Sequence, residues 1–252
     1  MSYIDLDGIR THYDVFGSGD PVVLLHGGLA GAESWFAQQQ PLGDAGYQVH
    51  VPERRGHGRT PDVEGPLTYS VMADDTVRYL DAVVGGPAHL IGWSDGAVVA
   101  ALVAMRRPDL ARRIVLIGQY FDDDGKMPDG VVDGLAAWRT DPPDFLVAQY
   151  AATSPDGVDH LPVFLGKVFD MWDREPTIPI ADFASITAPT LVLQGDCDDV
   201  TVEHSTAIAR AVANGRLAVL PGTHALPVEC PDVVNPLLLS FLAHDAPRVM
   251  GA

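Results

Sequence analysis

One short motif in the sequence could present a nucleophile: Gly92-Trp93-Ser94-Asp95-Gly96. It follows a buried apolar run at 88–91 and precedes an apolar helical pattern at 97–105, which predicts a tight strand-to-helix turn. A serine on such a turn has a strained backbone, requires small residues two positions away on either side, and exposes its hydroxyl at the start of a helix. We therefore interpret Ser94 as a nucleophile rather than as part of an ordinary glycine turn.

A serine hydroxyl becomes an effective nucleophile only when a base takes its proton. Of the nine histidines, His224 is the best candidate, because it follows a predicted strand in the last quarter of the chain. The base in turn needs a carboxylate that holds its tautomer. Three aspartates, Asp196, Asp198 and Asp199, follow the strand predicted at 190–194. The residues alone do not choose between them.

A second glycine-rich turn, His26-Gly27-Gly28-Leu29-Ala30-Gly31, follows the buried apolar run at 21–25. Glycines allow the backbone to approach a substrate and to direct N–H groups at it, and an oxyanion hole needs two such donors. The Asp95 amide would be one donor, and the Gly28 amide would be the other, with Leu29 as the next candidate. We expect His26 to support this loop through hydrogen bonds. The alternative is a tight turn that binds no ligand.

The elements that must position these residues alternate between buried strands and helices. An alternating segment with a turn at Gly8 predicts an initial hairpin. Short apolar runs, most of them ending in glycine, predict strands at 21–25, 47–51, 88–92, 113–118, 190–195 and 216–222. Helical spacing predicts helices at 69–84, 97–105, 203–213 and 232–243. This alternation is typical of an α/β fold with a mainly parallel sheet and helices on both faces.

Residues 119–186 interrupt this alternation with many acids, seven prolines and scattered aromatic residues. We interpret them as an insertion of short helices and loops, a lid, between two core segments at 1–118 and 187–252. Apolar residues of the lid and core could line a substrate pocket. The candidates for substrate contact are Leu29, Trp35, Trp93, Trp138 and Trp172. The alternative is that most of them only pack the lid onto the core.

Taken together, these motifs resemble the α/β-hydrolase superfamily over nearly the whole chain. The stretch 53–60 also resembles the family pattern D-x-R-G-x-G-x-S, with Glu53 in place of Asp and Thr60 in place of Ser. In that family the acid of the triad follows the strand glycine, here Gly195, by three residues. The resemblance therefore implies Asp198, and it implies a catalytic triad in the chain order Ser94, Asp198, His224.

The resemblance also implies an eight-stranded, mostly parallel sheet with an antiparallel first hairpin and a lid inserted after the sixth strand. Ser94 departs from the dehalogenase and epoxide-hydrolase branches, which use aspartate as the nucleophile. Asp95 departs from the cofactor-free haloperoxidases, which usually have methionine there. The elbow looks most like that of the biphenyl hydrolase-like (valacyclovirase) branch. For that branch an acidic residue near the start of the lid is implied to bind a substrate ammonium group, and Asp123 is the matching candidate.

The chain of 252 residues has a formal net charge of -18, which disfavours nucleic acid and anionic membranes as partners. Residues 119–186 hold 13 of the 34 acids but only 4 of the 16 bases. A negative field over the lid would favour cationic or neutral esters, and salt would screen that preference. The alternative is that these acids only form a solvated surface.

The N-terminus has no signal-peptide pattern, no apolar run approaches the ~20 residues of a membrane span, and the two cysteines fit a reducing compartment. We therefore expect a cytoplasmic protein. We recognise no metal or cofactor motif, and we expect a monomer or homodimer that acts on a small molecule.

These residues favour a serine hydrolase that cleaves a small carboxylic ester, lactone or thioester through an acyl-enzyme on Ser94. Two enzymatic alternatives use the same triad: a C–C bond hydrolase and an acyltransferase. A third alternative is a receptor that binds a ligand on this fold without catalysis.

Overall fold

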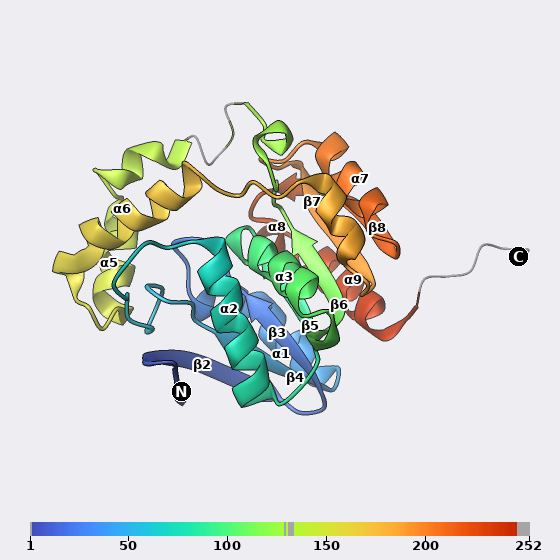
Figure 1. Ribbon diagram of the computed structural model, residues 1–252, viewed down its shortest axis with the longest axis horizontal. Coiled ribbons are helices and arrows are strands. Elements are labelled where there is room, and N and C mark those ends of the chain that lie inside the picture. The colour runs from blue at the N-terminus through green and yellow to red at the C-terminus, as the bar shows by residue number, and fades with distance from the viewer. Residues whose placement is uncertain (1, 129, 131–133, 246–252) are drawn as a thin grey trace, which may run out of the picture.

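The computed structural model describes residues 2–128, 130 and 134–245. Its centre is an eight-stranded sheet in the order β1-β2-β4-β3-β5-β6-β7-β8 (Figure 1). The strands are β1 (Ser2–Leu6), β2 (Ile9–Gly17), β3 (Asp20–Leu25), β4 (Tyr47–Pro52), β5 (Ala88–Trp93), β6 (Ala111–Ile117), β7 (Thr190–Cys197) and β8 (Gly215–Thr223).

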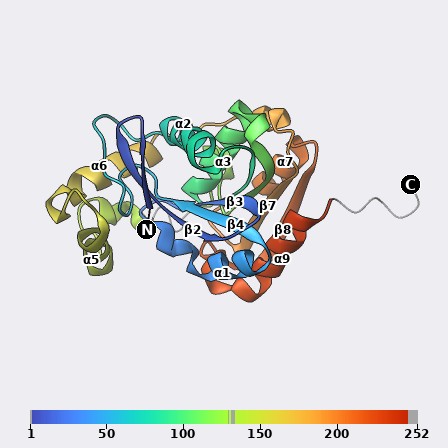
Figure 2. The same ribbon diagram turned by 90° about the horizontal axis from the view of Figure 1, so that it is seen from below.

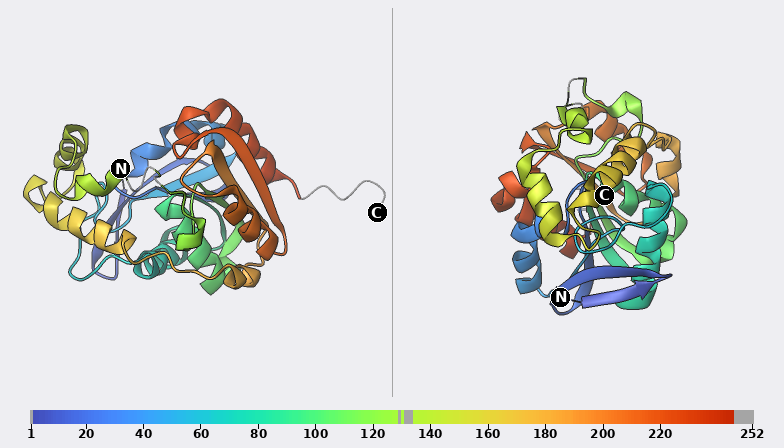
Figure 3. Two further views of the ribbon diagram at one scale, coloured as in Figure 1. Left: turned by 90° about the horizontal axis from the view of Figure 1, so that it is seen from above. Right: turned by 90° about the vertical axis from the view of Figure 1, so that its left-hand side faces the viewer.

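Among the described strands of the sheet, only the N-terminal hairpin departs from parallel pairing. β2 pairs antiparallel with both β1 and β4. The remaining neighbours, in the order β4-β3-β5-β6-β7-β8, all pair in parallel. The hairpin therefore forms one edge of the sheet, as the end-on view shows (Figure 3, right). The predicted eight-stranded, mostly parallel sheet with an antiparallel first hairpin is confirmed.

Helices cover both faces of the sheet and enclose two apolar cores. α1 (Phe36–Asp44) and α9 (Pro231–Ala243) pack on one face, and α2 (Tyr69–Tyr79), α3 (Asp95–Arg106) and α7 (Val202–Ala211) pack on the other (Figure 2). A π-helical turn at Leu80–Val84 extends α2 to the end of the helix predicted at 69–84. α1 was not predicted from the sequence, because it contains Pro41 and has little amphipathic character.

The segment between β6 and β7 includes residues 119–186 (the inserted segment), and its described residues form short helices rather than strands of the sheet. Its described elements are η4 (Asp123–Gly125), η5 (Ala136–Arg139), α5 (Asp144–Thr153), η6 (Val158–His160), α6 (Leu161–Trp172) and η7 (Ile180–Ser185). α5 and α6 lie at one end of the molecule, apart from the helices that cover the sheet (Figure 1, yellow). Among the described residues, no helix combines the length and apolarity that crossing a membrane requires.

Parallel pairing brings the carboxyl ends of five strands to the same edge of the sheet. β3 ends at Leu25, β5 at Trp93 and β6 at Ile117, and β7 and β8 end close to one another, with Cys197 opposite Thr223. Gly28, Ser94, Asp198 and His224 all lie directly beyond the ends of these strands. Ligands of open α/β sheets bind at this edge.

Candidate active site

Ser94 lies on a strained turn between β5 and α3. Its φ of 55° and ψ of -124° lie outside the conformations that a residue with a side chain readily adopts. Hydrogen bonds hold this conformation, since the Ser94 amide donates to the Ile117 carbonyl at 2.9 Å and its carbonyl accepts from Ala97 at 2.7 Å. The side chain therefore lies at the N-terminus of a helix, where the helix dipole favours negative charge.

The two glycines of the motif are required by close backbone contacts. A Cβ at Gly92 would collide with the carbonyl of Gly96, and a Cβ at Gly96 would collide with the carbonyl of Leu25 at the end of β3. Backbone atoms cannot move aside as a flexible side chain can. The small residues expected on either side of the nucleophile therefore let α3 approach the sheet.

We expect Gly96→Ala to lower the free energy of unfolding by about 3 kcal/mol or more, because its methyl group would overlap the backbone of β3. Gly166→Ala is the matched control, since Gly166 lies within α6 and a Cβ there would meet no atom within 4 Å. That substitution should be neutral or stabilising by up to about 1 kcal/mol. Urea unfolding measures both, and a Gly96→Ala variant as stable as the wild type would contradict this account.

The structure pairs His224 with one of the three candidate aspartates. His224 Nδ1 donates to Asp198 Oδ1 at 2.8 Å, and the Asp198 side chain is fully buried. The Asp198 carboxylate also accepts from the amides of Asp199 at 2.7 Å and Gly195 at 3.3 Å. Asp196, by contrast, is exposed and accepts from the Gly222 amide at 2.9 Å.

The surrounding backbone leaves room for this pair. Gly118, directly after β6, has a φ of +59°, and a Cβ there would lie 2.8 Å from Asp198 Oδ2. The Trp93 indole donates to the His224 carbonyl at 2.8 Å. Because Nδ1 is bonded to the carboxylate, the tautomer that leaves Nε2 free to accept a proton is favoured.

One cavity contains both Ser94 and His224. It is lined by Gly27, Gly28, Ala30, Tyr69, Trp93, Ser94, Asp95, Gln119, Tyr120, Leu135, Trp172, Asp199 and His224. Ser94, His224 and both candidate oxyanion donors, Gly28 and Asp95, therefore share one cavity.

Of the six candidates for substrate contact, Trp93 and Trp172 line this cavity. Leu29 lines a neighbouring cavity, and Trp35 is fully buried in the core, where its ring packs edge-on against Trp93. Trp138 packs edge-on against the exposed Phe145 of α5. Asp123, in η4, is exposed. These four residues are not among the described residues that line the cavity.

Several lining residues were not singled out from the sequence. Gln119 and Tyr120 follow β6 after Gly118, so their position beyond the end of a parallel strand was a usable signal. Tyr69, the first residue of α2, and Leu135 had no such signal. Their side chains reach the cavity because of how α2 and the inserted segment pack.

The Asp95 carboxylate connects the inserted segment to α3. It is 3% exposed, accepts from the Tyr69 hydroxyl at 2.8 Å, and has both oxygens 3.1 Å from the Trp172 indole nitrogen. Burial raises the pKa of Asp95, while Arg54, Tyr69 and Trp172 act in the opposite direction. Trp172 also approaches the glycine loop, since a Cβ at Gly28 would lie 2.5 Å from its ring.

His26 supports the glycine loop, as expected. Its Nδ1 donates to the Gly27 carbonyl at 2.8 Å, and its Nε2 accepts from the Arg54 amide at 3.1 Å. Both bonds require the neutral tautomer with the proton on Nδ1. Burial lowers the pKa of His26 well below its ordinary value, which keeps this tautomer uncharged.

Comparisons with known proteins agree with this architecture. The model of the "Alpha/beta hydrolase family" matches residues 22–237. The putative carbamate hydrolase RutD of Variovorax paradoxus is 32% identical, with 94% of this chain and 98% of the relative covered. The human serine hydrolase BPHL is 28% identical, with 95% of this chain and 85% of the relative covered.

A solved structure shows the same fold. The meta-cleavage product hydrolase of Pseudomonas fluorescens IP01 superposes with a TM-score of 0.78 at 22% identity, over 96% of this chain and 97% of that one. The family model covers most of the chain, from β3 into α9. The protein therefore belongs to the α/β-hydrolase family.

Proposed function

We propose that the protein is a serine hydrolase that cleaves a small carboxylic ester through an acyl-enzyme on Ser94. The observation that carries this proposal is the cavity in which a strained serine at a helix N-terminus meets His224, itself bonded to the buried Asp198. This combination contains the nucleophile, base and orienting acid that acyl transfer needs. Lactones and thioesters present the same electrophilic carbon and are included.

In the proposed reaction, Ser94 Oγ attacks the carbonyl carbon while its proton passes to His224 Nε2. The amides of Gly28 and Asp95 stabilise the oxyanion, and Asp198 stabilises the imidazolium. Collapse of the tetrahedral intermediate breaks the bond to the leaving alcohol, which takes the proton from His224. A water molecule, deprotonated by His224, then attacks the acyl carbon. Collapse of this second tetrahedral intermediate breaks the bond to Ser94 Oγ and releases the carboxylic acid, and His224 returns the proton to Oγ.

A substrate panel tests the proposal. It should contain p-nitrophenyl acetate, a lactone, a thioester and a carbamate, the last because one relative is named a putative carbamate hydrolase. We expect turnover of at least one member and covalent labelling by a fluorophosphonate. A product assay with a dicarbonyl compound separates C–C hydrolysis, and added alcohol acceptors separate acyl transfer. A folded protein that neither turns over nor becomes labelled would instead support a receptor.

The pH profile should show His224 as the base. Burial acts to lower the pKa of His224, but the hydrogen bond and charge of Asp198 outweigh it, so the pKa is raised. His224 must be neutral to accept a proton, so activity is lost as the pH falls through this raised pKa. We expect the acidic limb of kcat/KM for p-nitrophenyl acetate to lie above pH ~6.5. An acidic limb of the wild-type pH profile at a clearly lower pH would contradict the pairing of His224 with Asp198.

The charges around the cavity favour neutral or cationic substrates. The lining residues include Asp95 and Asp199 but neither lysine nor arginine among the described residues. None of the described acids of the inserted segment lines the cavity, and some of them form ion pairs, as Asp170 and Asp173 do with Arg139. We therefore propose that any preference for cationic esters comes from the cavity aspartates.

The salt dependence of kcat/KM distinguishes two origins of this selectivity, the cavity aspartates and the acidic field of the inserted segment. We expect kcat/KM to be higher for an amine-bearing ester than for its neutral isostere, and this ratio to persist between 20 mM and 500 mM NaCl, because buried charges are weakly screened. A ratio that disappears at high salt would instead support the acidic field of the inserted segment. Equal kcat/KM values at both salt concentrations would contradict both origins.

A further inference from the structure

We propose that Arg54 is a positioning residue of the oxyanion hole, which holds the His26 and Gly27 carbonyls so that the Gly28 N–H faces the cavity. This inference rests on the proposed function. Arg54 directly follows Glu53 after β4, and it is 4% exposed. It touches neither the nucleophile nor the substrate in the mechanism above, so its role would be exerted through the glycine loop.

The contacts place the guanidinium group directly behind this loop. One terminal nitrogen of Arg54 donates to the His26 carbonyl, and the other donates to the Gly27 carbonyl at 3.0 Å. The Gly27 carbonyl also accepts from His26 Nδ1 at 2.8 Å. Two consecutive peptide groups are therefore fixed by one planar fork, an arrangement that arginine can provide and lysine cannot.

The direction of the Gly28 amide follows from peptide geometry. In a planar trans peptide the C=O of one residue and the N–H of the next point in opposite directions. Since the Gly27 carbonyl points at Arg54, the Gly28 N–H points away from Arg54. Gly28 lines the cavity, and none of the hydrogen bonds among the described residues uses its amide.

The two glycines make such support necessary. Without a Cβ, both residues can adopt several backbone conformations, so the peptide between them could rotate and present its carbonyl to the cavity. An oxygen in that place would repel an oxyanion rather than bind it. Rotation would break the bonds that the Gly27 carbonyl accepts from Arg54 and His26, so these bonds oppose it.

The positive charge of Arg54 also favours an oxyanion in the hole. Burial lowers the pKa of its guanidinium to about 10, and the charge of Asp95 opposes this shift, so Arg54 is cationic at neutral pH. A cation in this dry environment stabilises negative charge that develops at the hole. The charge of the nearby Asp95 carboxylate offsets the desolvation cost of burying this cation in the free protein.

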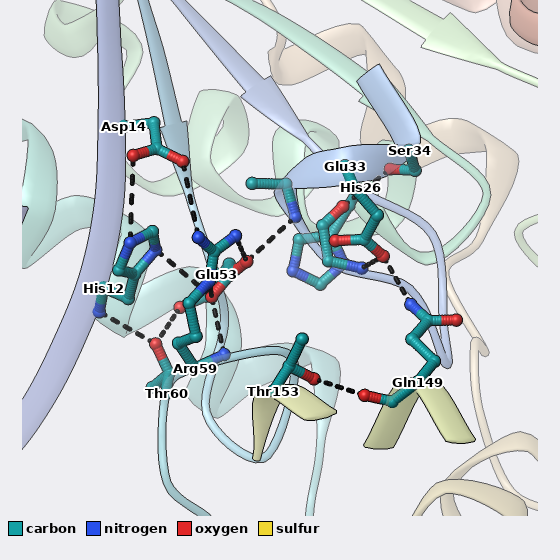
Figure 4. Close-up of polar contacts among 12 residues, drawn as sticks. His12, Asp14, His26, Glu33, Ser34, Glu53, Arg59, Thr60, Gln149 and Thr153 are labelled. Atoms are coloured by element: carbon teal, nitrogen blue, oxygen red, sulfur yellow. Dashed lines mark hydrogen bonds and ion pairs between the residues drawn. The ribbon is translucent and has the colours of Figure 1, made fainter. Parts of the chain in front are cut away.

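The loop that carries Arg54 is itself fixed by Glu53. The buried Glu53 carboxylate lies 3.2 Å from His12 Nδ1, and it accepts from the Arg59 guanidinium at 2.8 Å and from the Ala32 amide at 3.2 Å (Figure 4). Burial acts to raise the pKa of Glu53, but the hydrogen bonds of His12 and Arg59 lower it to about 2. Glu53 therefore joins β2, the Arg54 loop and the end of the glycine loop.

The experiment compares Arg54→Met with Arg55→Met. Arg55 is the matched control, because it is the neighbouring arginine and forms a partly buried bidentate pair with Asp75 at 2.6 and 2.7 Å. For Arg54→Met we expect kcat for p-nitrophenyl acetate to fall by about 10²–10³-fold, the loss associated with one oxyanion donor, with KM within twofold of wild type. Arg55→Met should keep kcat within twofold.

The inhibition constant of phenylboronic acid is a measurement that a purely structural role of Arg54 would leave unchanged. Its tetrahedral adduct with Ser94 places an oxygen in the hole, so its inhibition constant should rise in Arg54→Met by about the factor lost in kcat. The fluorescence midpoint of unfolding monitors the fold. A folded Arg54→Met variant with wild-type kcat and wild-type boronate affinity would overturn the inference.

Two further variants keep the test decisive if Arg54→Met fails to fold. Arg54→Met combined with Asp95→Asn leaves no unpaired buried charge and is compared with Asp95→Asn alone. Arg54→Lys keeps the charge but loses the fork, and it should lose at least tenfold in kcat. Wild-type kcat in Arg54→Lys, or equal kcat in the double and single variants, would overturn the inference. A wild type without turnover or labelling would instead refute the proposed function.

Discussion

Replacing Ser94 by alanine should lower kcat for p-nitrophenyl acetate by about 10⁶-fold and abolish fluorophosphonate labelling. The reason is chemical, because the acyl-enzyme cannot form without Oγ. The backbone should not change, since alanine meets the same constraint at a φ of 55° as serine does. The residual rate should therefore reflect substrate binding and the oxyanion donors alone.

The matched control for this prediction is Ser185→Ala. Ser185 is an exposed serine at the end of η7, and its hydroxyl donates to the Asp182 carbonyl at 2.6 Å. Kinetics and labelling of this variant should equal those of the wild type. If Ser94→Ala still became labelled or kept more than about 1% of kcat, another residue would be the nucleophile and the proposed mechanism would be wrong.

The turn that holds Ser94 could be predicted from sequence because its requirements are local. A strained serine, glycines two positions away and flanking apolar runs all lie within one short segment, and the structure places each of them as expected. The fold was predictable for a related reason, since strands buried on both faces read as continuous apolar runs. α1 was missed because its sequence carries no clear helical period.

The residues that line the cavity could not be predicted in the same way. An aromatic residue packs equally well against the core or against a cavity, and only the placement of helices decides between them. Trp172 reaches the cavity because α6 brings its indole onto Asp95, whereas Trp35 lies beneath Trp93. Asp123 was chosen by position along the chain, and it is exposed because η4 turns it to solvent.

The choice among three neighbouring aspartates illustrates the same limit, since all of them lie on one turn after β7. From the residues alone each could face the histidine, and the resemblance to the family implied Asp198. In the structure the amides of Gly195 and Asp199 and the space left at Gly118 direct Asp198 toward His224. Its role in catalysis is a prediction that substitution can test.

Asp198→Asn should lower kcat by about 10⁴-fold with little change in KM. The amide keeps the size of the carboxylate but provides no charge for the imidazolium. Its NH₂ group can also donate to His224 Nδ1, which would place the histidine proton on Nε2, where it blocks acceptance of the serine proton. The raised pKa of His224 should fall as well, so the acidic limb of the remaining activity should move to lower pH.

Asp196→Asn and Asp199→Asn complete the comparison. Asp196 accepts only a backbone bond from Gly222 among its described contacts, and asparagine can still accept it, so this variant should retain wild-type kcat. Asp199 lines the cavity, and its substitution should change substrate preference more than kcat. A 10⁴-fold loss at either of these positions, with Asp198→Asn near wild type, would assign the acid elsewhere on the turn. The three variants thus separate the residue that orients the base from two carboxylates of the same turn that only neighbour it.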